Sequence, residues 1–268
     1  MAICTQRTVV ITGAGAGLGR AYALAFAQEG ANVVINDIRA EAAQAVADEV
    51  RAAGGQAIAN TGDITTLAGA QSILDATLAA FGDVHVLVNN AGVLRDRMFL
   101  SLSEEDWDTV MRVHLRGHFC MGNTFGRYWR DRKKAGHAVD ARIINTSSGA
   151  GLQGSIGQSN YSAAKGGVNA LTASLAMENT KHGIRINATA PGGTDAPPRR
   201  VPRNQNAVEQ TAQEKEWYQG VIDQTIDSSL MHRYGTIEEQ VAPILFFASD
   251  ESSYITGSVL PVGGGDLG

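Results

Sequence analysis

Short apolar runs alternate with longer stretches of helical pattern along most of the chain. The short runs are rich in Val and Ile, which favour β-strands. Between them lie Ala-rich stretches such as 41–53 and 67–81, closed by Gly54 and Gly82, which suit helix C-terminal caps. The strands predicted from this pattern are Thr8–Thr12, Asn32–Asp37, Gln56–Asn60, Val84–Gly92, Ala141–Ser148, Ile184–Gly193 and Ser258–Gly265.

This alternation of strand and helix predicts an α/β fold, a doubly wound parallel sheet in one domain over residues 1–268. No internal repeat or low-complexity linker divides the chain. The segment from about 192 to 231 departs from the pattern, because a Pro/Arg loop follows the sixth strand and leads into a polar helical stretch. Ligands bind outside the carboxyl ends of the strands in such sheets, so this segment is a candidate substrate lid.

Composition and charge exclude several kinds of partner. The net charge of −5 gives no basic footprint for nucleic acid or an anionic membrane surface. The two cysteines, Cys4 and Cys120, are too few for a disulfide framework, and no apolar run is long enough to span a membrane. The first apolar run is reached without the pattern of a signal peptide. We therefore expect a cytoplasmic protein that binds neither nucleic acid nor membrane and has no metal site.

The first candidate site is the glycine-rich stretch "TGAGAGLG", Thr12 to Gly19, between the first strand and a helical pattern. A flexible turn is the alternative interpretation. In this context, however, Gly13, Gly17 and Gly19 permit a tight turn, close approach of the backbone to a pyrophosphate and close helix packing. With Leu18 at the start of the helix, the N-terminal N–H groups face the anion. The stretch predicts dinucleotide binding.

Acidic residues at the ends of the next two strands refine the cofactor prediction. Asp37 follows Gly19 by 18 residues, where a carboxylate accepts hydrogen bonds from the adenosine ribose and repels a 2′-phosphate. This favours NAD over NADP, although Arg39 nearby is either a surface residue or a partner for such a phosphate. Asp63, with Ile64 beside it, is placed to reach the adenine amino group; the alternative is a loop or helix-capping aspartate.

Tyr161 and Lys165 stand four residues apart in a helical pattern, so both side chains lie on one helix face. Ser148 ends the fifth strand. A tyrosine with a pKa near 10 is a poor base at neutral pH, but a neighbouring ammonium favours the phenolate. Tyr161 would then accept the proton of a substrate alcohol while hydride leaves its carbon. Ser148 would bond the substrate oxygen, and Lys165 would also hold the nicotinamide ribose.

These motifs, taken in order, resemble the short-chain dehydrogenase/reductase family over essentially the whole chain. The resemblance implies a seven-stranded Rossmann-like sheet, NAD(P) and usually a homotetramer. It places Asn90, Ala91 and Gly92 beside the cofactor ribose, and Pro191 and Gly192 beside the nicotinamide. The residues that carry it are "TGAGAGLG", "NNAG" (Asn89–Gly92), Ser148, "YSAAK" (Tyr161–Lys165) and "PG" (Pro191, Gly192).

The chain departs from the family pattern at two positions. Many members carry an Asn that holds a water of the proton relay where this chain has His114. His114 would substitute through its own backbone carbonyl, pack within the helix or, as a further alternative, transfer a proton directly. The usual Thr after the P-G motif is Ala196, so Thr194 is the candidate replacement for the contact with the nicotinamide amide.

Two parts of the sequence resemble different relatives. The stretch 89–119 resembles the hydroxyacyl-CoA dehydrogenase domain of peroxisomal multifunctional enzymes. The stretches 165–176 and 187–268 resemble the dehydrogenases of benzoate degradation, which oxidise a cis-dihydroxycyclohexadiene carboxylate to a catechol and CO₂. The segment after the sixth strand shapes the substrate pocket, so the second resemblance bears more directly on the substrate.

Three arginines agree with an anionic substrate. Arg199, Arg200 and Arg203 follow the sixth strand, and an arginine grips a carboxylate bidentately. They are alternatively solvent-facing or bound to acidic groups of a neighbouring subunit. Our first hypothesis is an NAD-dependent dehydrogenase of a carboxylated cis-dihydrodiol. The second is a hydroxyacyl-CoA or other secondary-alcohol dehydrogenase, whose arginines would meet CoA phosphates. The third is a cofactor-binding scaffold without turnover.

Overall fold

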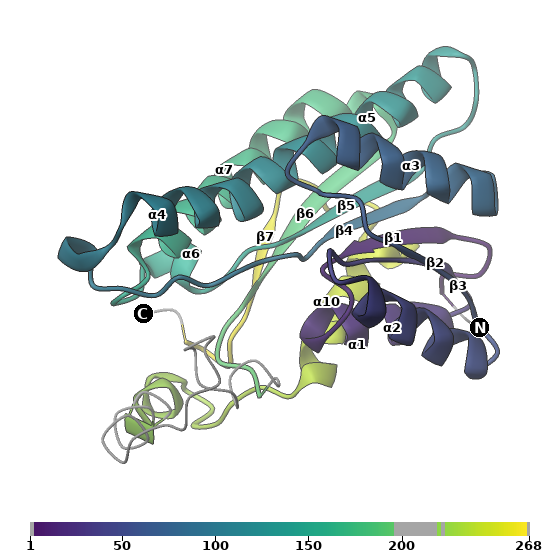
Figure 1. Cartoon of the computed structure of the whole chain (residues 1–268). Helices are drawn as coiled ribbons and strands as arrows, with labels where there is room; N and C mark the ends of the chain where they lie inside the picture. Colours follow the sequence, from purple (N-terminus) through teal and green to yellow (C-terminus); the bar gives the residue numbers. More distant parts are fainter. Residues whose placement is uncertain (1–2, 196–218, 221–222, 267–268) are drawn as a thin grey trace.

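The structure, a computed structural model, describes residues 3–195, 219–220 and 223–266. Within these residues, seven strands form one parallel sheet in the order β3-β2-β1-β4-β5-β6-β7 (Figure 1). This confirms the predicted doubly wound, Rossmann-like α/β sheet. The strands are β1 (Thr8–Thr12), β2 (Asn32–Asn36), β3 (Gln56–Asn60), β4 (Val86–Asn89), β5 (Ala141–Thr146), β6 (Ile184–Pro191) and β7 (Val259–Val262).

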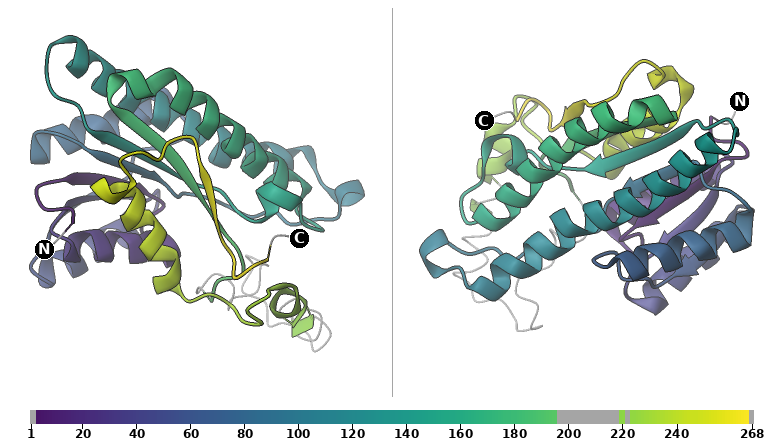
Figure 2. Two further views of the ribbon diagram at one scale, coloured as in Figure 1. Left: turned by 180° about the vertical axis from the view of Figure 1, so that it is seen from behind. Right: turned by 90° about the horizontal axis from the view of Figure 1, so that it is seen from above.

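Helices cover both faces of the sheet (Figures 1 and 2). One face is covered by α1, α2 and α10, and the other by α3, α5 and α7. The α-helices are α1 (Gly17–Gln28), α2 (Ala40–Ala52), α3 (Leu67–Phe81), α4 (Glu104–Met111), α5 (Gly117–Lys134), α6 (Ala150–Gln153), α7 (Ser159–Asn179) and α10 (Ile237–Ala248). The short turns are η1 (Phe99–Ser101), the π-helical η2 (Arg112–Arg116), η3 (Thr180–His182) and η4 (Asp250–Ser252).

The core consists of two apolar layers, one on each face of the sheet. Successive strand residues point to opposite faces, so Val9 packs with Phe26 of α1, while Val10 packs with Phe125 of α5. All five residues of β1 are buried, as expected for a central strand covered on both faces. The near-continuous apolar runs of the sequence therefore become the middle of the sheet.

Both predicted helix caps are confirmed. Gly82 ends α3 in the left-handed conformation with φ 78°, and its N–H bonds the Leu78 carbonyl. Gly54, with φ 88°, follows α2 in the same conformation. A Cβ at either glycine would meet nothing within 4 Å. Backbone conformation, rather than crowding, therefore requires glycine at these two positions.

Five strands, β2, β4, β5, β6 and β7, are shorter than predicted, and the reason is visible in two of them. β4 stops at Asn89 instead of Gly92, because the Asn90 and Ala91 N–H groups both turn to the Thr12 hydroxyl, at 3.0 and 3.1 Å. β7 stops at Val262 rather than Gly265. Gly264 and Gly265 there have φ values of 63° and 87°, which extended strands do not adopt.

The chain order of the strands reverses between β1 and β4. β1 pairs with β2 on one side and with β4 on the other, so their following loops diverge. In an open parallel sheet this reversal creates the crevice in which ligands bind, at the carboxyl ends of the strands. The predicted cofactor and chemical sites both follow strands at this edge.

The predicted lid, about 192–231, lies largely outside the described residues and stays a prediction. Its described parts connect to the sheet edge: Thr194 forms a parallel bridge with Gly235, and the Met231 N–H bonds the Gly264 carbonyl at 3.0 Å. Residues 223–228 are helical, as predicted for this stretch. None of the helices in the described ranges is long and apolar enough to cross a membrane.

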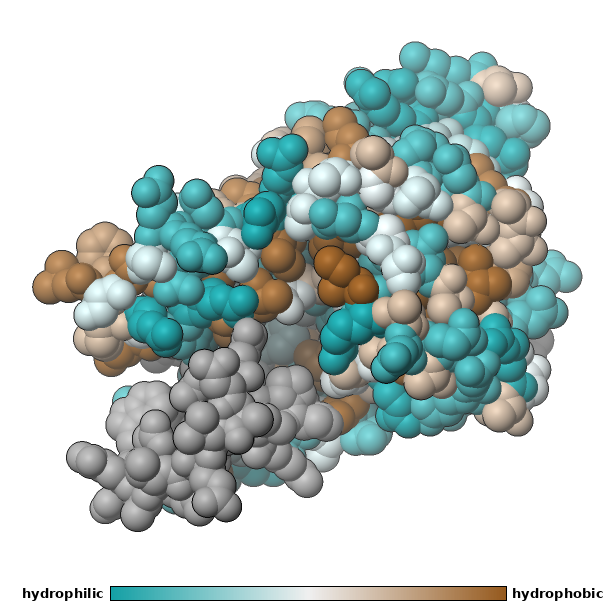
Figure 3. Space-filling model, viewed as in Figure 1, coloured by the Kyte–Doolittle hydropathy of each residue, from teal (hydrophilic) through white to brown (hydrophobic). Residues whose placement is uncertain are grey.

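Three successive apolar residues are exposed at one extremity of the molecule. Figure 3 shows hydrophobic side chains at the extremity formed by η1 and the chain before α4. Met98, Phe99 and Leu100 there are 63%, 67% and 97% exposed. Single exposed apolar residues are ordinary, but three in succession form a patch that water solvates poorly.

Candidate active site

The glycine-rich turn brings backbone close to backbone at the start of α1. Gly13 and Gly17 have φ values of 64° and 54°. A Cβ on Gly13 would lie 2.6 Å from the Cα of Ala91, and one on Gly19 would overlap the Gly13 carbonyl oxygen. A side chain on Gly13 would push the glycine-rich turn away from the loop that carries Ala91, and one on Gly19 would collide with the turn itself. The close approach of the backbones therefore requires glycine.

The N-terminus of α1 fits a bound pyrophosphate. The residue before the helix, Ala16, has no side chain that can cap it, so no cap side chain bonds the first N–H groups of the helix. Those groups and the positive end of the helix dipole favour an anion. Leu18 in the first turn packs against the apolar layer beneath. The turn therefore fits the dinucleotide predicted from the sequence.

Hydrogen bonds join the glycine turn to the "NNAG" loop. The Thr12 hydroxyl accepts the N–H groups of Asn90 and Ala91, and the Asn90 amide nitrogen donates to the carbonyls of Thr12 and Gly13 at 3.0 and 3.2 Å. Gly92 then passes so close to the His114 ring that a Cβ would clash with it. The two predicted cofactor motifs thus form one continuous loop surface.

Asp37 lies at the carboxyl end of β2 and is 7% exposed. Its carboxylate accepts the Gly15 N–H at 3.0 Å and the Arg39 N–H at 3.0 Å. The Arg39 guanidinium also pairs with it, at 3.2 Å and 3.3 Å. The Arg39 side chain is 63% exposed and is thus easily displaced. Asp37 is therefore placed beside the glycine turn, as predicted, with Arg39 across its outer face.

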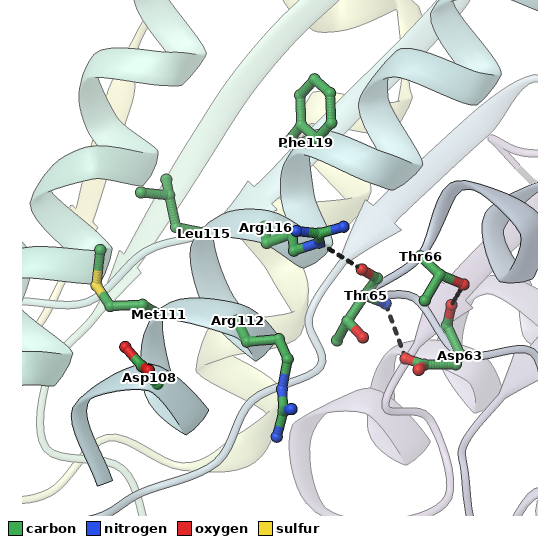
Figure 4. A pocket seen from close by; sticks show the side chains of 9 residues that line it. All are labelled: Asp63, Thr65, Thr66, Asp108, Met111, Arg112, Leu115, Arg116 and Phe119. Atoms are coloured by element: carbon green, nitrogen blue, oxygen red, sulfur yellow. Dashed lines mark hydrogen bonds between the residues drawn. The ribbon is translucent and has the colours of Figure 1, made fainter. Parts of the chain in front are cut away.

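Asp63 lies further along the same edge, after β3. Its carboxylate accepts the Thr65 N–H at 2.8 Å, and its carbonyl accepts the hydroxyl of Thr66, the N-cap of α3, at 3.3 Å (Figure 4). This geometry agrees with the alternative interpretation of a loop aspartate, and the contact with adenine stays a prediction. Ile64 is buried in the apolar layer and meets Gly117 of α5.

The structure brings Ser148, Tyr161 and Lys165 to the carboxyl edge of β5. Ser148 follows β5, and its hydroxyl accepts the Ala150 N–H at 3.2 Å. Tyr161 and Lys165 lie one turn apart on α7, which packs closely against α6 and β6. The Lys165 Nζ lies 5.6 Å from the centre of the Tyr161 ring. Tyr161 and Lys165 therefore share one face of α7, as predicted.

Lys165 is almost completely buried, at 2% exposure. Its ammonium donates a hydrogen bond to the Thr146 carbonyl oxygen at the end of β5. Burial lowers the pKa of Lys165 to about 7, because a desolvated charge is less stable than a hydrated one. Lys165 therefore changes protonation in the neutral pH range, unlike an ordinary lysine.

His114 lies in the π-helical turn and is 2% exposed. Its Nε2 lies 2.8 Å from the Val93 carbonyl oxygen and 3.1 Å from the Val93 nitrogen. The ring stands edge-on to Tyr161, with centroids 5.1 Å apart and an interplanar angle of 89°. Burial and the Lys165 charge lower the pKa of His114 well below its ordinary value, which disfavours an imidazolium. His114 is a neutral packing partner of Tyr161.

The chain after β6 closes the other side of the site. The Gly149 N–H bonds the Pro191 carbonyl at 3.0 Å, and a Cβ on Gly192 would lie 2.6 Å from the Cα of Gly263. Thr194 is 5% exposed, and its hydroxyl donates to the Gly192 carbonyl. The remaining predicted residues, Ala196, Arg199, Arg200 and Arg203, lie outside the described residues.

Sequence reasoning missed His118, which is 3% exposed on α5 and bonds the backbone carbonyl of His114. The two histidines stand four residues apart in "VHLRGHF". That spacing puts both on one helix face and was the available signal. It also missed the backbone of Val93, because a main-chain partner leaves no mark on residue identity.

The chain matches the family model described as short chain dehydrogenase over residues 7–207. It is 46% identical over 267 residues to a 1,6-dihydroxycyclohexa-2,4-diene-1-carboxylate dehydrogenase of Acinetobacter baylyi, covering 98% of this chain and 97% of that protein. Identity to the Pseudomonas putida protein of the same name is 42% over 269 residues, covering 98% and 93%. The second predicted relationship is also present, because the mouse peroxisomal multifunctional enzyme type 2 is 37% identical over 98% of this chain, which spans 32% of that protein.

A solved structure agrees with the sequence relationships. The 3-ketoacyl-(acyl-carrier-protein) reductase of Brucella melitensis, in complex with NADH, superposes with a TM-score of 0.84 at 28% identity, covering 98% of this chain and 99% of that one. Family model, relatives and fold therefore agree with one another. The chain belongs to the short-chain dehydrogenase family.

Proposed function

We propose that this dehydrogenase oxidises a carboxylated cis-dihydrodiol, of the 1,6-dihydroxycyclohexa-2,4-diene-1-carboxylate type, with NAD as the hydride acceptor. The observation that carries the chemistry is the Tyr161–Lys165 pair, whose lysine bonds the end of β5, the strand that Ser148 follows, at the edge of the sheet where the glycine turn also lies. A hydroxyl, a base and a cation at one edge are the groups that alcohol oxidation requires.

Tyr161 is the base in this proposal. The nearby Lys165 ammonium favours negative charge on the phenol oxygen, which then accepts the proton of the substrate alcohol. Ser148 donates to the substrate oxygen and orients it. A bound nicotinamide ring supplies the acceptor for the hydride that leaves the alcohol carbon. The edge-on His114 ring keeps the phenol from turning away from the substrate.

The second half of the reaction needs no further group from the chain. Oxidation of the ring alcohol leaves a ketone beside the carbon that carries the carboxylate. The carboxylate–carbon bond then breaks, its electron pair moves towards the ketone oxygen, and CO₂ departs. The ring takes up a proton at that oxygen and becomes a catechol. The dihydrodiol carboxylate and NAD are thus converted to catechol, CO₂ and NADH.

The relatives support the choice of substrate. Identity is 46% to the dihydroxycyclohexadiene carboxylate dehydrogenase and 37% to the peroxisomal enzyme, each over 98% of this chain. The sequence after β6 carries Arg199, Arg200 and Arg203. Arginine binds carboxylates through two parallel hydrogen bonds, and we propose that these residues bind the substrate carboxylate.

The surroundings of Asp37 support NAD rather than NADP. A carboxylate at the end of β2 repels a 2′-phosphate and accepts hydrogen bonds from ribose hydroxyls. Arg39, the nearby cation that would attract a phosphate, is paired with Asp37. Since Gly15 and Arg39 supply four donors to the carboxylate, we propose that the exposed Arg39 side chain moves aside when ribose binds.

We further propose a cytoplasmic homotetramer. Cys4 and Cys120 are buried free thiols, which suits a reducing compartment. A groove of about 760 Å³ runs along the outer side of α4, η2 and α5 (Figure 4). Met111, Leu115 and Phe119 line it one turn apart, beside the opposite charges of Asp108 and Arg112. Such a face suits a second copy, because a two-fold axis can pair each charge with its opposite.

The substrate proposal is tested by following NADH absorbance with purified protein, NAD and four alcohol classes. These are dihydrodiol carboxylates, neutral cis-dihydrodiols, 3-hydroxyacyl-CoAs and simple secondary alcohols. We expect kcat/KM for a dihydrodiol carboxylate to exceed that for the matched neutral diol by about tenfold or more, since a hydrogen bond to a charged group is worth roughly 1.5–3 kcal/mol. CO₂ should be released in step with NADH.

Replacement of Arg199 and Arg200 by Gln provides the matched control. Both substitutions should lower kcat/KM for the carboxylate and leave the neutral diol unchanged. Turnover of acyl-CoA with none of the diols would instead identify a hydroxyacyl-CoA dehydrogenase.

Lys165 should make stability depend on pH in an unusual range. Its native pKa is about 7, whereas the unfolded lysine keeps a value near 10.5. Between these values the unfolded chain binds a proton that the native chain lacks, so stability rises with pH. From pH 7 to 10, the unfolding free energy of the wild type should gain about 3–4 kcal/mol relative to Lys165→Met, measured by urea titration. Lys181→Met, at an exposed lysine, is the control. Its unfolding free energy should change with pH in the same way as that of the wild type. Parallel curves for Lys165→Met would contradict the assigned pKa.

Asp37→Ala should shift the cofactor preference towards NADP. The loss of a charged acceptor should lower kcat/KM with NAD by about 10- to 100-fold. The released Arg39 guanidinium should raise kcat/KM with NADP. The double variant Asp37→Ala/Arg39→Ala should lose that gain, which assigns it to Arg39. An unchanged NAD/NADP ratio in the single variant would show that Asp37 does not face the ribose.

A further inference from the structure

A second buried histidine lies one helical turn after His114. His118 is 3% exposed, and its Nδ1 lies 2.5 Å from the backbone carbonyl oxygen of His114. A carbonyl can only accept a hydrogen bond, so Nδ1 of His118 carries the hydrogen. Its Nε2 is buried and finds no hydrogen-bond partner among the described residues. Among the described residues, the His118 side chain therefore makes one hydrogen bond, to the backbone carbonyl of His114.

That contact is made to an irregular turn. The segment Arg112–Arg116 is π-helical and joins α4 to α5. The Gly117 N–H bonds the Arg112 carbonyl five residues back, and also that of His114. A π-turn replaces the usual pairing of N–H groups with carbonyls four residues back, and such turns are rare and frequently lie at functional sites. The His118 side chain supplies the His114 carbonyl with an additional donor at this point.

The π-turn holds the residue that packs on Tyr161. The His114 ring is fixed at one edge by Val93, at 2.8 Å, and stands edge-on to the Tyr161 ring at 5.1 Å. One nitrogen cannot donate to the Val93 carbonyl and accept from its N–H at once, so this anchor has a single hydrogen bond at any moment. The backbone of His114 is contacted from the other side, where its carbonyl meets the Gly117 N–H and the His118 side chain. His118 is the side chain in contact with it there.

We propose that His118 is a positioning residue for the oxidation. Its Nδ1–H holds the His114 carbonyl, fixes the π-turn and thereby keeps the His114 ring against Tyr161. This inference rests on the role proposed above for Tyr161. Burial lowers the pKa of His118 to about 3, so the side chain is neutral throughout the neutral pH range, and its one N–H is the Nδ1–H that faces the His114 carbonyl.

The test compares His118→Asn with His118→Leu. The amide nitrogen of Asn stands one bond from Cγ, as Nδ1 does, whereas Leu has the same shape as Asn and no donor. We expect His118→Leu to lower kcat by about 10- to 100-fold, with KM for NAD unchanged. His118→Asn should keep kcat within about threefold of the wild type. Equal losses in both variants, or no loss in either, would overturn the proposal.

A double variant separates positioning through His114 from any other effect. If His118 acts through that residue, His118→Leu should cause no further loss of kcat in a His114→Ala background. Losses that multiply would show that His118 acts by another route.

A spectroscopic measurement tests the hydrogen bond from His118 to the His114 carbonyl without any need for a substrate. The imidazole ¹⁵N shifts of the wild-type protein, free of cofactor and substrate, should show His118 as the Nδ1–H tautomer. An Nε2–H tautomer would overturn the proposal, whatever the substrate proves to be. A protein that shows the Nδ1–H tautomer but no turnover of any alcohol would instead contradict the proposed function. The two failures are thus distinguishable.

Discussion

The hydrogen bond from the Lys165 ammonium to the Thr146 carbonyl joins α7 to the end of β5, and the geometry of the site depends on it. Taking an ammonium out of water costs several kcal/mol unless hydrogen bonds replace the hydration shell. A methionine of similar length would fill the same space without that cost. The buried ammonium lies on the same helix face as Tyr161, where its positive charge favours the phenolate form of the tyrosine.

The cofactor side of the site depends on a similar constraint at the reversal point of the sheet. Thr12 and Asn90 tie the loops after β1 and β4 together, so the glycine turn and the "NNAG" loop cannot separate. The glycines between them let the backbones approach to distances that a Cβ would prevent. Because β4 and β5 are neighbours, this surface lies directly beside the end of β5, where Ser148 follows the strand and Lys165 of α7 bonds the Thr146 carbonyl. The two predicted cofactor-binding loops and the predicted reacting groups therefore lie at the same edge of the sheet.

Local patterns were sufficient to predict the fold and the placement of Tyr161 and Lys165 on one helix face. The seven apolar runs became the seven strands, and the four-residue spacing of Tyr161 and Lys165 became a shared helix face. Each of these depends only on the period of a strand or helix. Gly54 and Gly82 were predictable for the same reason, since a left-handed residue after a helix favours glycine.

Contacts made through the backbone were not predictable. The bond from the Arg39 backbone N–H to the Asp37 carboxylate depends on how the chain turns after β2, and the bond from His118 to the His114 carbonyl depends on a π-turn that propensities do not indicate. The predicted length of β4 was too great for a related reason. The strand ends where the Asn90 N–H bonds the hydroxyl of Thr12, a residue far away in the sequence.

The central claim is that Tyr161 accepts the proton of the alcohol as hydride leaves the carbon. Stopped-flow measurement of NADH formation by Tyr161→Phe tests it most directly, with cofactor affinity determined in parallel. The account predicts a loss of about 10²- to 10⁴-fold in the rate of hydride transfer, with NAD affinity nearly unchanged. A variant that transfers hydride within about tenfold of the wild-type rate would contradict it, because another group would then have to accept the proton.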